Sequence, residues 1–239
     1  MNQGFIRFDE GLKQLNIVLN HDQKNQFLKY YDLLVEGNKV MNLTAITDFD
    51  EVIDKHFIDS LSMVKIYNIS NEKIIDVGTG AGFPGIPIKI AFPNTRIVLL
   101  DSLNKRVGFL NEVIKELKLD GIETIHGRAE DYGKDSKYRE EFDISTSRAV
   151  ANLTTLAEYC IPFVKTGGCF IPYKSGDVTE EVDSAKKAIK ILGGSIEELR
   201  NFQLPATDIE RSLIRINKDS KTPMKYPRAA GKPGKEPLA

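Results

Sequence analysis

A buried strand, a glycine-rich loop and a helix follow one another between residues 73 and 91. Lys73–Val77 is a short apolar run with β-branched residues, which is typical of a strand inside a parallel sheet. Ile86–Ala91 begins a helix whose first turn tolerates Pro87. Between them stand glycines at positions 78, 80, 82 and 85. This order predicts an α/β, Rossmann-like fold that binds a phosphate or a nucleoside over the loop.

The acidic residue before the loop decides which ligand the loop suits. Residues 80–85 fit the dinucleotide pattern G-x-G-x-x-G, whereas Asp76 followed by alternating glycines fits the pattern of S-adenosylmethionine-binding methyltransferases. A carboxylate repels a pyrophosphate at the helix N-terminus, but the sulfonium and ammonium of S-adenosylmethionine are cations. We therefore expect this cofactor. The residues expected to hold its methionine part are Asp76, Gly78, Thr79, Gly80, Gly82 and Phe83.

Further apolar runs along the chain predict the rest of the sheet. Four of them are separated by helical patterns, which indicates parallel strands, and the last two are expected to form an antiparallel hairpin. With the strand before the glycine loop they make a mostly parallel sheet of seven strands. The runs are residues 95–101, 122–126, 141–147, 167–174, 195–204 and 209–217.

Residues at two strand ends are placed to hold a nucleoside. Asp101 ends the second strand, 21 residues after Gly80, close to the spacing at which a carboxylate meets ribose hydroxyls. Ala129 and Glu130 follow the third strand, where backbone N–H groups and a carboxylate can meet the edge of adenine. The competing interpretation of Ala129 and Glu130 is an acidic turn that caps the next helix.

Two cations follow strands on the side of the sheet where ligands of open α/β folds lie. Arg148 leaves the fourth strand and Lys174 ends the fifth, so both are at carboxyl ends. We expect these two residues to be catalytic and to face the substrate. A structural salt bridge is the alternative for Arg148.

The segments before and after the sheet region differ from it in kind. Residues 1–70 carry apolar residues at helical spacing and are expected to form an N-terminal helical cap on the methyltransferase domain, residues 71–217. His56 and Asp59 lie in this cap, either as helix-surface contacts or as substrate contacts. Residues 218–239 are a tail with six basic and two acidic residues, either solvated or in contact with RNA phosphates.

Composition excludes several classes of protein. The chain has 239 residues and a net charge of −1, so it is not polybasic as a whole. No apolar run approaches membrane-spanning length and no secretion signal is visible, so we expect a cytoplasmic protein without a membrane partner. Cys160 and Cys169 give neither zinc spacing nor a disulfide framework, and no metal site is expected.

Missing residue types bear on the methyl acceptor. Methylation of an exocyclic amine usually goes with an Asn/Asp-Pro-Pro-aromatic turn after the fourth strand, but the turn here is Ser147–Val150. Methylation of a pyrimidine C5 needs a cysteine nucleophile at a strand end. Cys160 and Cys169 fall within a helix and within a strand, as small core residues. Cationic donors without an obvious base suit a nucleophile with a free lone pair, such as a purine ring nitrogen.

Several segments, in order over almost the whole chain, resemble the RsmG (GidB) family of bacterial methyltransferases, which act on a guanine N7 of 16S ribosomal RNA. The Gly-Phe-Pro-Gly-Ile-Pro run is far more specific than a generic glycine motif. The tail departs from the family at Ala229, where a second Arg is usual. The segments are Asn38–Ala45, His56–Leu61, Asp76–Pro87, Leu100–Arg106, Ser147–Ala149 and Tyr226–Arg228.

The resemblance implies a class I S-adenosylmethionine-dependent enzyme that methylates N7 of a guanine in 16S rRNA without a general base. The implied partner is this RNA or the small ribosomal subunit, not DNA, and the protein is expected to be a monomer. The residues alone leave two other functions open, an NAD-dependent oxidoreductase and a non-catalytic RNA-binding factor for ribosome assembly. The cofactor-binding residues that the resemblance implies are Gly78, Phe83, Ala129, Glu130 and Arg148.

Overall fold

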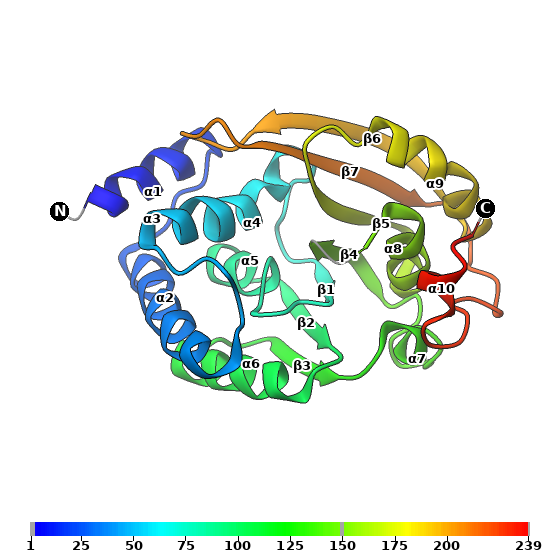
Figure 1. Cartoon of the computed structure of the whole chain (residues 1–239), viewed down its shortest axis with the longest axis horizontal. Coiled ribbons are helices and arrows are strands. Elements are labelled where there is room, and N and C mark those ends of the chain that lie inside the picture. The colour runs from blue at the N-terminus through cyan, green and yellow to red at the C-terminus, as the bar shows by residue number, and fades with distance from the viewer. Residues whose placement is uncertain (1–2, 149–150, 239) are drawn as a thin grey trace.

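The computed structural model describes residues 3–148 and 151–238, so Ala149 and Val150 of the predicted Ser147–Val150 turn lie outside the described residues. One seven-stranded sheet runs through the molecule in the order β3-β2-β1-β4-β5-β7-β6 (Figure 1). Strands β1 to β5 pair in parallel, whereas β7 pairs antiparallel with β5 and β6. The predicted, mostly parallel sheet is therefore confirmed. The strands are β1 Lys73–Val77, β2 Arg96–Asp101, β3 Ile122–His126, β4 Phe142–Arg148, β5 Val164–Ser175, β6 Gly194–Gln203 and β7 Glu210–Lys218.

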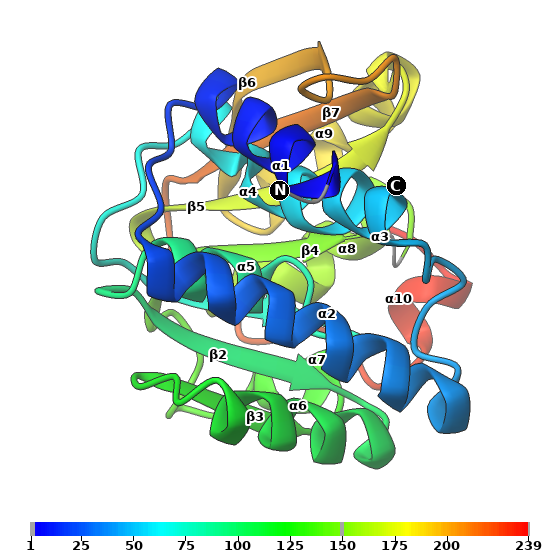
Figure 2. The same cartoon turned by 90° about the vertical axis from the view of Figure 1, so that its left-hand side faces the viewer.

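Helices cover both faces of the sheet (Figures 1 and 2). One face carries α1 Gln3–Gln14, α2 His21–Met41, α3 Phe49–Val52, a π-helical turn Ile53–Ile58, α4 Asp59–Leu61, a 3₁₀ turn Ser62–Lys65, α5 Gly85–Ala91 and α6 Asn104–Glu116. The other carries α8 Leu153–Cys160, a 3₁₀ turn Ile161–Phe163 and α9 Thr179–Ile191, with the short helices α7 Ala129–Tyr132 and α10 Lys232–Lys235 beside them. Within the described ranges, no helix has the length and apolar character needed to cross a membrane.

Alternation along the central strands builds a core on each face. Ile74 of β1 packs into the cluster under α1, α2, α5 and α6, while Ile75 packs into the cluster under α8 and α9. Successive side chains of a strand point to opposite faces, so a strand covered on both sides is apolar throughout. This is why Ile74, Ile75 and Val77 of the strand before the glycine loop are all apolar and buried.

The N-terminal helices are joined to the glycine loop by aromatic packing. Tyr30 of α2 stacks on Phe57 with ring centroids 5.6 Å apart, and it lies 5.3 Å from Phe83 of the loop. The buried Tyr30 hydroxyl donates a hydrogen bond of 2.6 Å to the carbonyl of Ala81. The position of the loop therefore depends on the helices before it.

The C-terminal segment packs in part onto the second face, while its lysines at positions 221, 225, 232 and 235 stay exposed. Tyr226 and Pro233 are buried, and Tyr226 belongs to the cluster under α8 and α9. Arg228 pairs with Glu158 of α8, whose carboxylate is almost fully buried. The physical reason is that Arg228, one of the basic residues of the tail, has a partner inside the protein. Without Arg228 the buried Glu158 carboxylate would have no counter-charge.

Candidate active site

The glycine loop is shaped by two different demands on its glycines. Gly80 has a φ of +64°, which L side chains rarely adopt, and a Cβ there would meet no atom within 4 Å. Its backbone therefore faces open space. Gly85 begins α5 so close to β2 that a Cβ would lie 2.3 Å from Leu99 Cδ2. The first glycine exposes the loop to a ligand, and the second lets the helix pack on the sheet.

Asp76 lies beneath the loop and is held there by contacts with the loop and the start of α5. Its Oδ2 accepts hydrogen bonds from Thr79 Oγ1 at 2.6 Å and from the Gly85 N–H at 2.9 Å. Its Oδ1 has no hydrogen-bond partner in the described part of the chain. Burial raises the pKa of Asp76 to about 6, although both hydrogen bonds oppose the shift. Asp76 is not among the residues that line the cavity above the loop.

The same contact bears on the dinucleotide alternative. Gly85 is the first residue of α5, so the Asp76 carboxylate already accepts from the N-terminus of the helix after the loop. A pyrophosphate at this position would meet a buried carboxylate instead of free N–H groups. The arrangement therefore disfavours an NAD-dependent oxidoreductase.

An inner cavity of about 400 Å³ opens above the loop. Asp101 forms part of its wall, and its carboxylate accepts from the Gly80 and Leu103 N–H groups at 2.9 Å each. Carboxylate oxygens offer about four acceptor sites, so this one can still accept from ribose hydroxyls. The volume, the exposed backbone at Gly80 and this carboxylate fit S-adenosylmethionine. The residues that line the cavity are Leu43, Thr44, His56, Gly78, Thr79, Gly80, Ala81, Phe83, Asp101, Ser102, Arg106 and Arg148.

Three other predicted cofactor residues do not line this cavity. Gly82 packs against the cap, since a Cβ there would lie 2.8 Å from the Tyr30 hydroxyl. Ala129 and Glu130 begin α7 at the carboxyl end of β3. Glu130 is buried, and its Oε1 accepts a hydrogen bond of 2.8 Å from the Gly231 N–H.

Arg148 reaches from the end of β4 to the N-terminal helices. Its Nη1 donates to the Lys55 carbonyl at 2.9 Å and to Asp59 Oδ2 at 3.0 Å. Its Nη2 lies 3.0 Å from His56 Nδ1. Arg211 of β7 donates from Nε to the other carboxylate oxygen of Asp59, also at 3.0 Å. We call His56, Asp59, Arg148 and Arg211 the arginine cluster.

The π-helical turn supplies one acceptor of this cluster. In an α-helix the N–H of Asp59 would bond to the carbonyl of Lys55, four residues earlier. Here it bonds to the carbonyl of Asp54, five residues earlier. The Lys55 carbonyl accepts from Arg148 instead. Wide turns of this kind are frequent at functional sites.

His56 is held neutral, with its lone pair already in use. Nδ1 lies 3.0 Å from Arg148 Nη2 and 3.1 Å from the Lys55 carbonyl. Arginine remains protonated and can only donate, so we assign the Nδ1 lone pair to Arg148, and Nε2 then donates to Thr44 Oγ1 at 2.9 Å. Burial and the Arg148 charge lower the pKa of His56 to about 3. The ring also stacks on Phe83, with centroids 4.4 Å apart. His56 is therefore a structural acceptor for Arg148 at neutral pH and not a free base.

An outer cavity of about 250 Å³ lies on the other side of Arg148. Its wall includes the predicted Lys174, whose Nζ donates to the Ala151 carbonyl at 2.7 Å and to Glu181 at 2.6 Å. His56 and Arg148 line both the inner and the outer cavity. The remaining residues of the outer wall are Ile46, Lys55, Asp59, Tyr173, Ser175 and Arg211.

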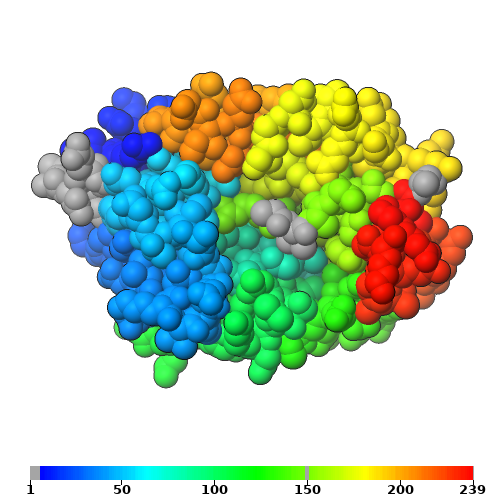
Figure 3. Space-filling model, viewed as in Figure 1, coloured from blue at the N-terminus to red at the C-terminus, as the bar shows by residue number. Residues whose placement is uncertain are grey.

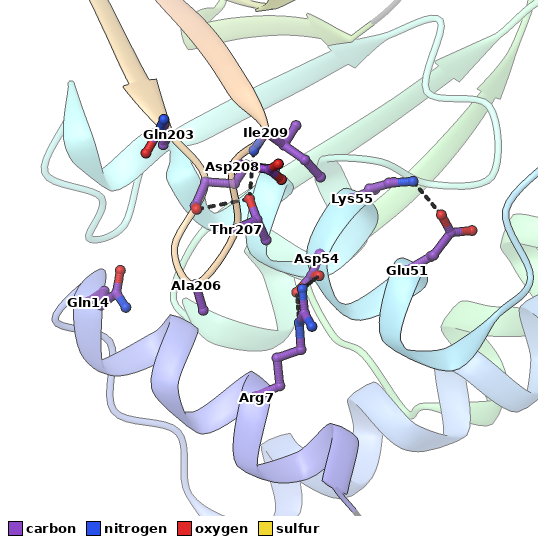
Figure 4. Close-up of a pocket in the computed structure, with 11 residues that line it drawn as sticks. Arg7, Gln14, Glu51, Asp54, Lys55, Gln203, Ala206, Thr207, Asp208 and Ile209 are labelled. Carbon is purple, nitrogen blue, oxygen red and sulfur yellow. Dashed lines mark hydrogen bonds and ion pairs between the residues drawn. The ribbon is translucent and has the colours of Figure 1, made fainter.

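A larger cavity, of about 630 Å³, lies between α1, the helix after residue 48 and the turn between β6 and β7 (Figure 4). Four of the five charged residues that line it, all but Asp208, form ion pairs with each other. Arg7 binds Asp54 at 2.9 Å, and Lys55 binds Glu51 (Figure 4). None of the predicted site residues lines it. The inner and outer cavities are therefore the better candidate site.

The sequence reasoning missed several residues of the site. Arg106 was not among the predicted site residues, but it lies 3.5 Å from Asp101 and lines the inner cavity. Its place in the Leu100–Arg106 segment of the resemblance was the available signal. For His56 and Asp59 the surface and the substrate interpretations were both open, and the structure buries both residues against Arg148. Arg211 carried no signal, because it is one charged residue at the start of an ordinary strand.

The cysteines are core residues, as predicted. Cys160 in α8 and Cys169 in β5 are both buried and free. Burial raises the pKa of Cys169 to about 12, so its thiol stays protonated. Among the residues that the structure describes, no group of three His, Cys, Asp or Glu side chains gathers as a metal site.

Comparison with known proteins identifies the family. A family model described as rRNA small subunit methyltransferase G matches residues 23–213. A ribosomal RNA small subunit methyltransferase G from Lachnoclostridium phytofermentans is 57% identical over 232 residues, which is 97% of this chain and 96% of the relative. A protein of the same name from Acetivibrio thermocellus is 56% identical over 229 residues, 96% of this chain and 94% of the relative.

The fold is also shared with more distant solved structures. TYW2 from M. jannaschii, solved in complex with AdoMet, matches with a TM-score of 0.50 and 15% identity. The match covers 62% of this chain and 69% of that one, and it shows the class I methyltransferase fold. The family model spans both the glycine loop and the whole arginine cluster. The chain therefore belongs to the rRNA small subunit methyltransferase G family.

Proposed function

We propose that this chain transfers a methyl group from S-adenosylmethionine to N7 of a guanine in 16S ribosomal RNA. Membership of the family supports the reaction. The observation that carries the proposal is that His56 and Arg148 line both cavities. A methyl donor in the inner cavity and a base in the outer cavity would meet beside the Arg148 guanidinium. In-line displacement depends on such a meeting of oriented reactants.

Each wall of the inner cavity has a role in this proposal. S-adenosylmethionine supplies an electrophilic methyl group on a sulfonium when it is bound. Gly78, Thr79, Gly80 and Phe83 would hold its methionine part, with Arg148 beside them, and Asp101 would accept from the ribose hydroxyls. Ala129 and Glu130 would meet adenine. Asp76 and Gly82 would act by shaping the loop, which their buried contacts support.

The outer cavity suits an RNA base and its phosphate. Four cations lie around it, namely Lys55, Arg148, Lys174 and Arg211. Arg is matched to guanine O6 and, like Lys, to phosphate. Guanine N7 already carries a free lone pair, so no proton has to be removed before attack. The neutral His56, whose lone pair accepts from Arg148, agrees with chemistry that needs no base.

The proposal extends to the organisation of the molecule. Residues 1–70 act as a cap that fixes the loop, residues 71–217 as the methyltransferase domain, and residues 218–239 as a C-terminal tail. The protein acts as a monomer in the cytoplasm, on the RNA or on the small ribosomal subunit. Sedimentation at assay concentration tests whether the protein is a monomer, since a dimer would move faster than a particle of 26.8 kDa.

Labelled methyl transfer tests the function directly. Unmodified 16S rRNA and small subunits are incubated with the protein and methyl-labelled S-adenosylmethionine, and the nucleosides are separated by mass spectrometry. We expect label in N7-methylguanosine, with 23S rRNA as the negative control. Label on another atom would contradict the proposed acceptor. RNA binding without any transfer would favour the non-catalytic assembly factor.

A further inference from the structure

We propose that the C-terminal strap, residues 219–238, positions the adenine end of the cofactor site by holding α7 in place. This inference rests on the proposed function, which puts adenine beside Ala129 and Glu130. Figure 3 shows the strap, coloured orange-red to red, as one continuous surface lying against the green part of the chain that contains α7. Arg228 is then a positioning residue, because it lines neither the inner nor the outer cavity.

Helix α7 needs such support because it is only four residues long. Helices this short are not stable on their own. The strap contacts α7 and the residue that ends it, Gly133, at two points. The Gly231 N–H donates to Glu130 Oε1 at 2.8 Å, and the Pro227 ring packs so closely on Gly133 that a Cβ there would lie 3.0 Å from it. Arg139 ties the same place together, because its Nη1 donates to the carbonyls of Gly133 and Tyr226 at 2.7 and 2.8 Å.

The strap is itself anchored on α8 by a buried ion pair. Arg228 Nε and Nη2 donate to the two carboxylate oxygens of Glu158 at 2.9 and 2.6 Å, and the Arg228 N–H donates to the same carboxylate at 2.8 Å. The Glu158 side chain is only 1% exposed. Bidentate pairs of this kind fix orientation as well as position. The chain between Arg228 and Gly231 is therefore fixed relative to α8, and α7 is fixed by it.

This arrangement has a consequence for recognition of adenine. The strap occupies Glu130 Oε1, whereas Oε2 makes no hydrogen bond to the described part of the chain. An adenine N6 amino group is a donor and can bond to Oε2, but the O6 of hypoxanthine is an acceptor and cannot. Once the ligand covers Oε2 and excludes water, leaving this acceptor unpaired costs about a factor of ten in affinity. The strap should therefore set the preference for the adenosyl over the inosyl form of the ligand.

The first test uses the wild-type protein and hydrogen exchange. Coupling between two sites is reciprocal, so S-adenosylhomocysteine must protect the strap if the strap supports its site. We expect this ligand to slow exchange severalfold at the amides of residues 226–233 as well as at 129–133. Protection confined to the glycine loop and residues 101–103 would overturn the inference. Failure of the ligand to bind at all would instead count against the proposed function.

The second test replaces the anchor and measures affinity by calorimetry. In Glu158→Gln/Arg228→Gln we expect the Kd of S-adenosylhomocysteine to rise about tenfold, and the preference over S-inosylhomocysteine to fall towards one. The matched control is Asp183→Asn/Lys186→Gln, an exposed pair on α9 joined at 2.6 Å. Unchanged affinity and preference in a folded anchor variant, checked by circular dichroism, would overturn the inference. If that variant does not fold, the exchange experiment decides.

Discussion

Arg148 acts through three contacts that no other cation can reproduce. Its planar fork binds the Lys55 carbonyl, Asp59 and His56 at once, while a lysine offers a single ammonium. We predict that Arg148→Lys lowers the single-turnover rate of methyl transfer by about 100-fold, the usual penalty for misplaced groups. Stability should change little, because Asp59 keeps its bond to Arg211.

Urea unfolding and the transfer assay measure the two quantities separately. Arg96→Lys, at an exposed position at the start of β2, is the matched control and should leave both unchanged. A transfer rate in Arg148→Lys within twofold of the wild type would show that the three contacts are structural only.

His56 makes stability depend on pH in a direction that can be worked out. Its pKa is about 3 in the folded protein and about 6.5 when unfolded, so the unfolded chain binds the proton between these values. Stability is therefore full above pH 6.5 and is lost as the pH falls towards 3, by about 1.4 kcal/mol per pH unit. We predict that His56→Gln flattens this slope in urea unfolding between pH 4.5 and 6.5.

Asp76 contributes the opposite slope. Its folded pKa of about 6 lies above the ordinary value of 3.8, so its contribution favours folding at low pH and is lost as the pH rises through 6. It is present in the wild type and in His56→Gln, so it cancels in the difference between them. Equal slopes for the two proteins would mean that His56 is not held neutral by the fold.

For single residues, the sequence predicts those that belong to a local motif. It misses those whose partners lie far away in the sequence. Phe83 and Asp101 line the inner cavity as expected, since their places follow from the loop and the strand end. The bond between Asp59 and Arg211 joins residues 152 positions apart. Neither residue has a neighbour in sequence that reveals the pairing.

The link between α2 and the glycine loop can be tested with two neighbouring tyrosines. Tyr30→Phe leaves the buried carbonyl of Ala81 without its 2.6 Å partner, which costs about 1–3 kcal/mol. We predict that loss in urea unfolding, together with weaker binding of S-adenosylhomocysteine. Tyr31→Phe removes an exposed bond to the Thr47 carbonyl and is the control, with a loss below about 0.5 kcal/mol. Equal effects of the two changes would mean that the Tyr30 hydrogen bond does not hold the glycine loop in place.

Two glycines on neighbouring helices are predicted to respond to alanine with opposite signs. At Gly85 a Cβ would lie 2.3 Å from Leu99 Cδ2, so Gly85→Ala should cost about 1–3 kcal/mol of stability by overpacking. At Gly108, exposed inside α6, a Cβ meets nothing within 4 Å, and Gly108→Ala should stabilise by up to about 1 kcal/mol. Thermal unfolding of both variants measures the contrast, and a stabilising change at Gly85 would contradict the packing argument.

Sequence patterns predict the existence of elements better than their internal geometry. All seven strands lie within a few residues of the predicted runs, because each is a distinct apolar segment between helical patterns. The π-helical turn at Ile53–Ile58 escaped notice, since its apolar spacing still reads as a helix. The strap escaped for a different reason, because its partner Glu158 lies in a helix whose burial only the fold determines.

At the scale of the whole molecule, the sequence predicts which strand ends lie along one edge of the sheet. It does not predict that the inner and outer cavities share a wall. Parallel strands joined by helices place all their carboxyl ends along one edge, which is why Arg148 and Lys174 line the same outer cavity. The wall between the cavities needs the cap as well, because His56 comes from the N-terminal helices and Arg148 from the sheet. Helical spacing alone does not say where a cap rests.

The rate of the methyl-transfer step against pH tests most directly whether this site works without a base. Single-turnover rates are measured from pH 6.5 to 8.5 with 16S rRNA and saturating S-adenosylmethionine. The account predicts a flat profile, because guanine N7 has no proton to lose and the pKa values of His56 and Asp76, about 3 and about 6, lie below this range. A rate that rises tenfold per pH unit to a plateau would reveal a general base and contradict the account.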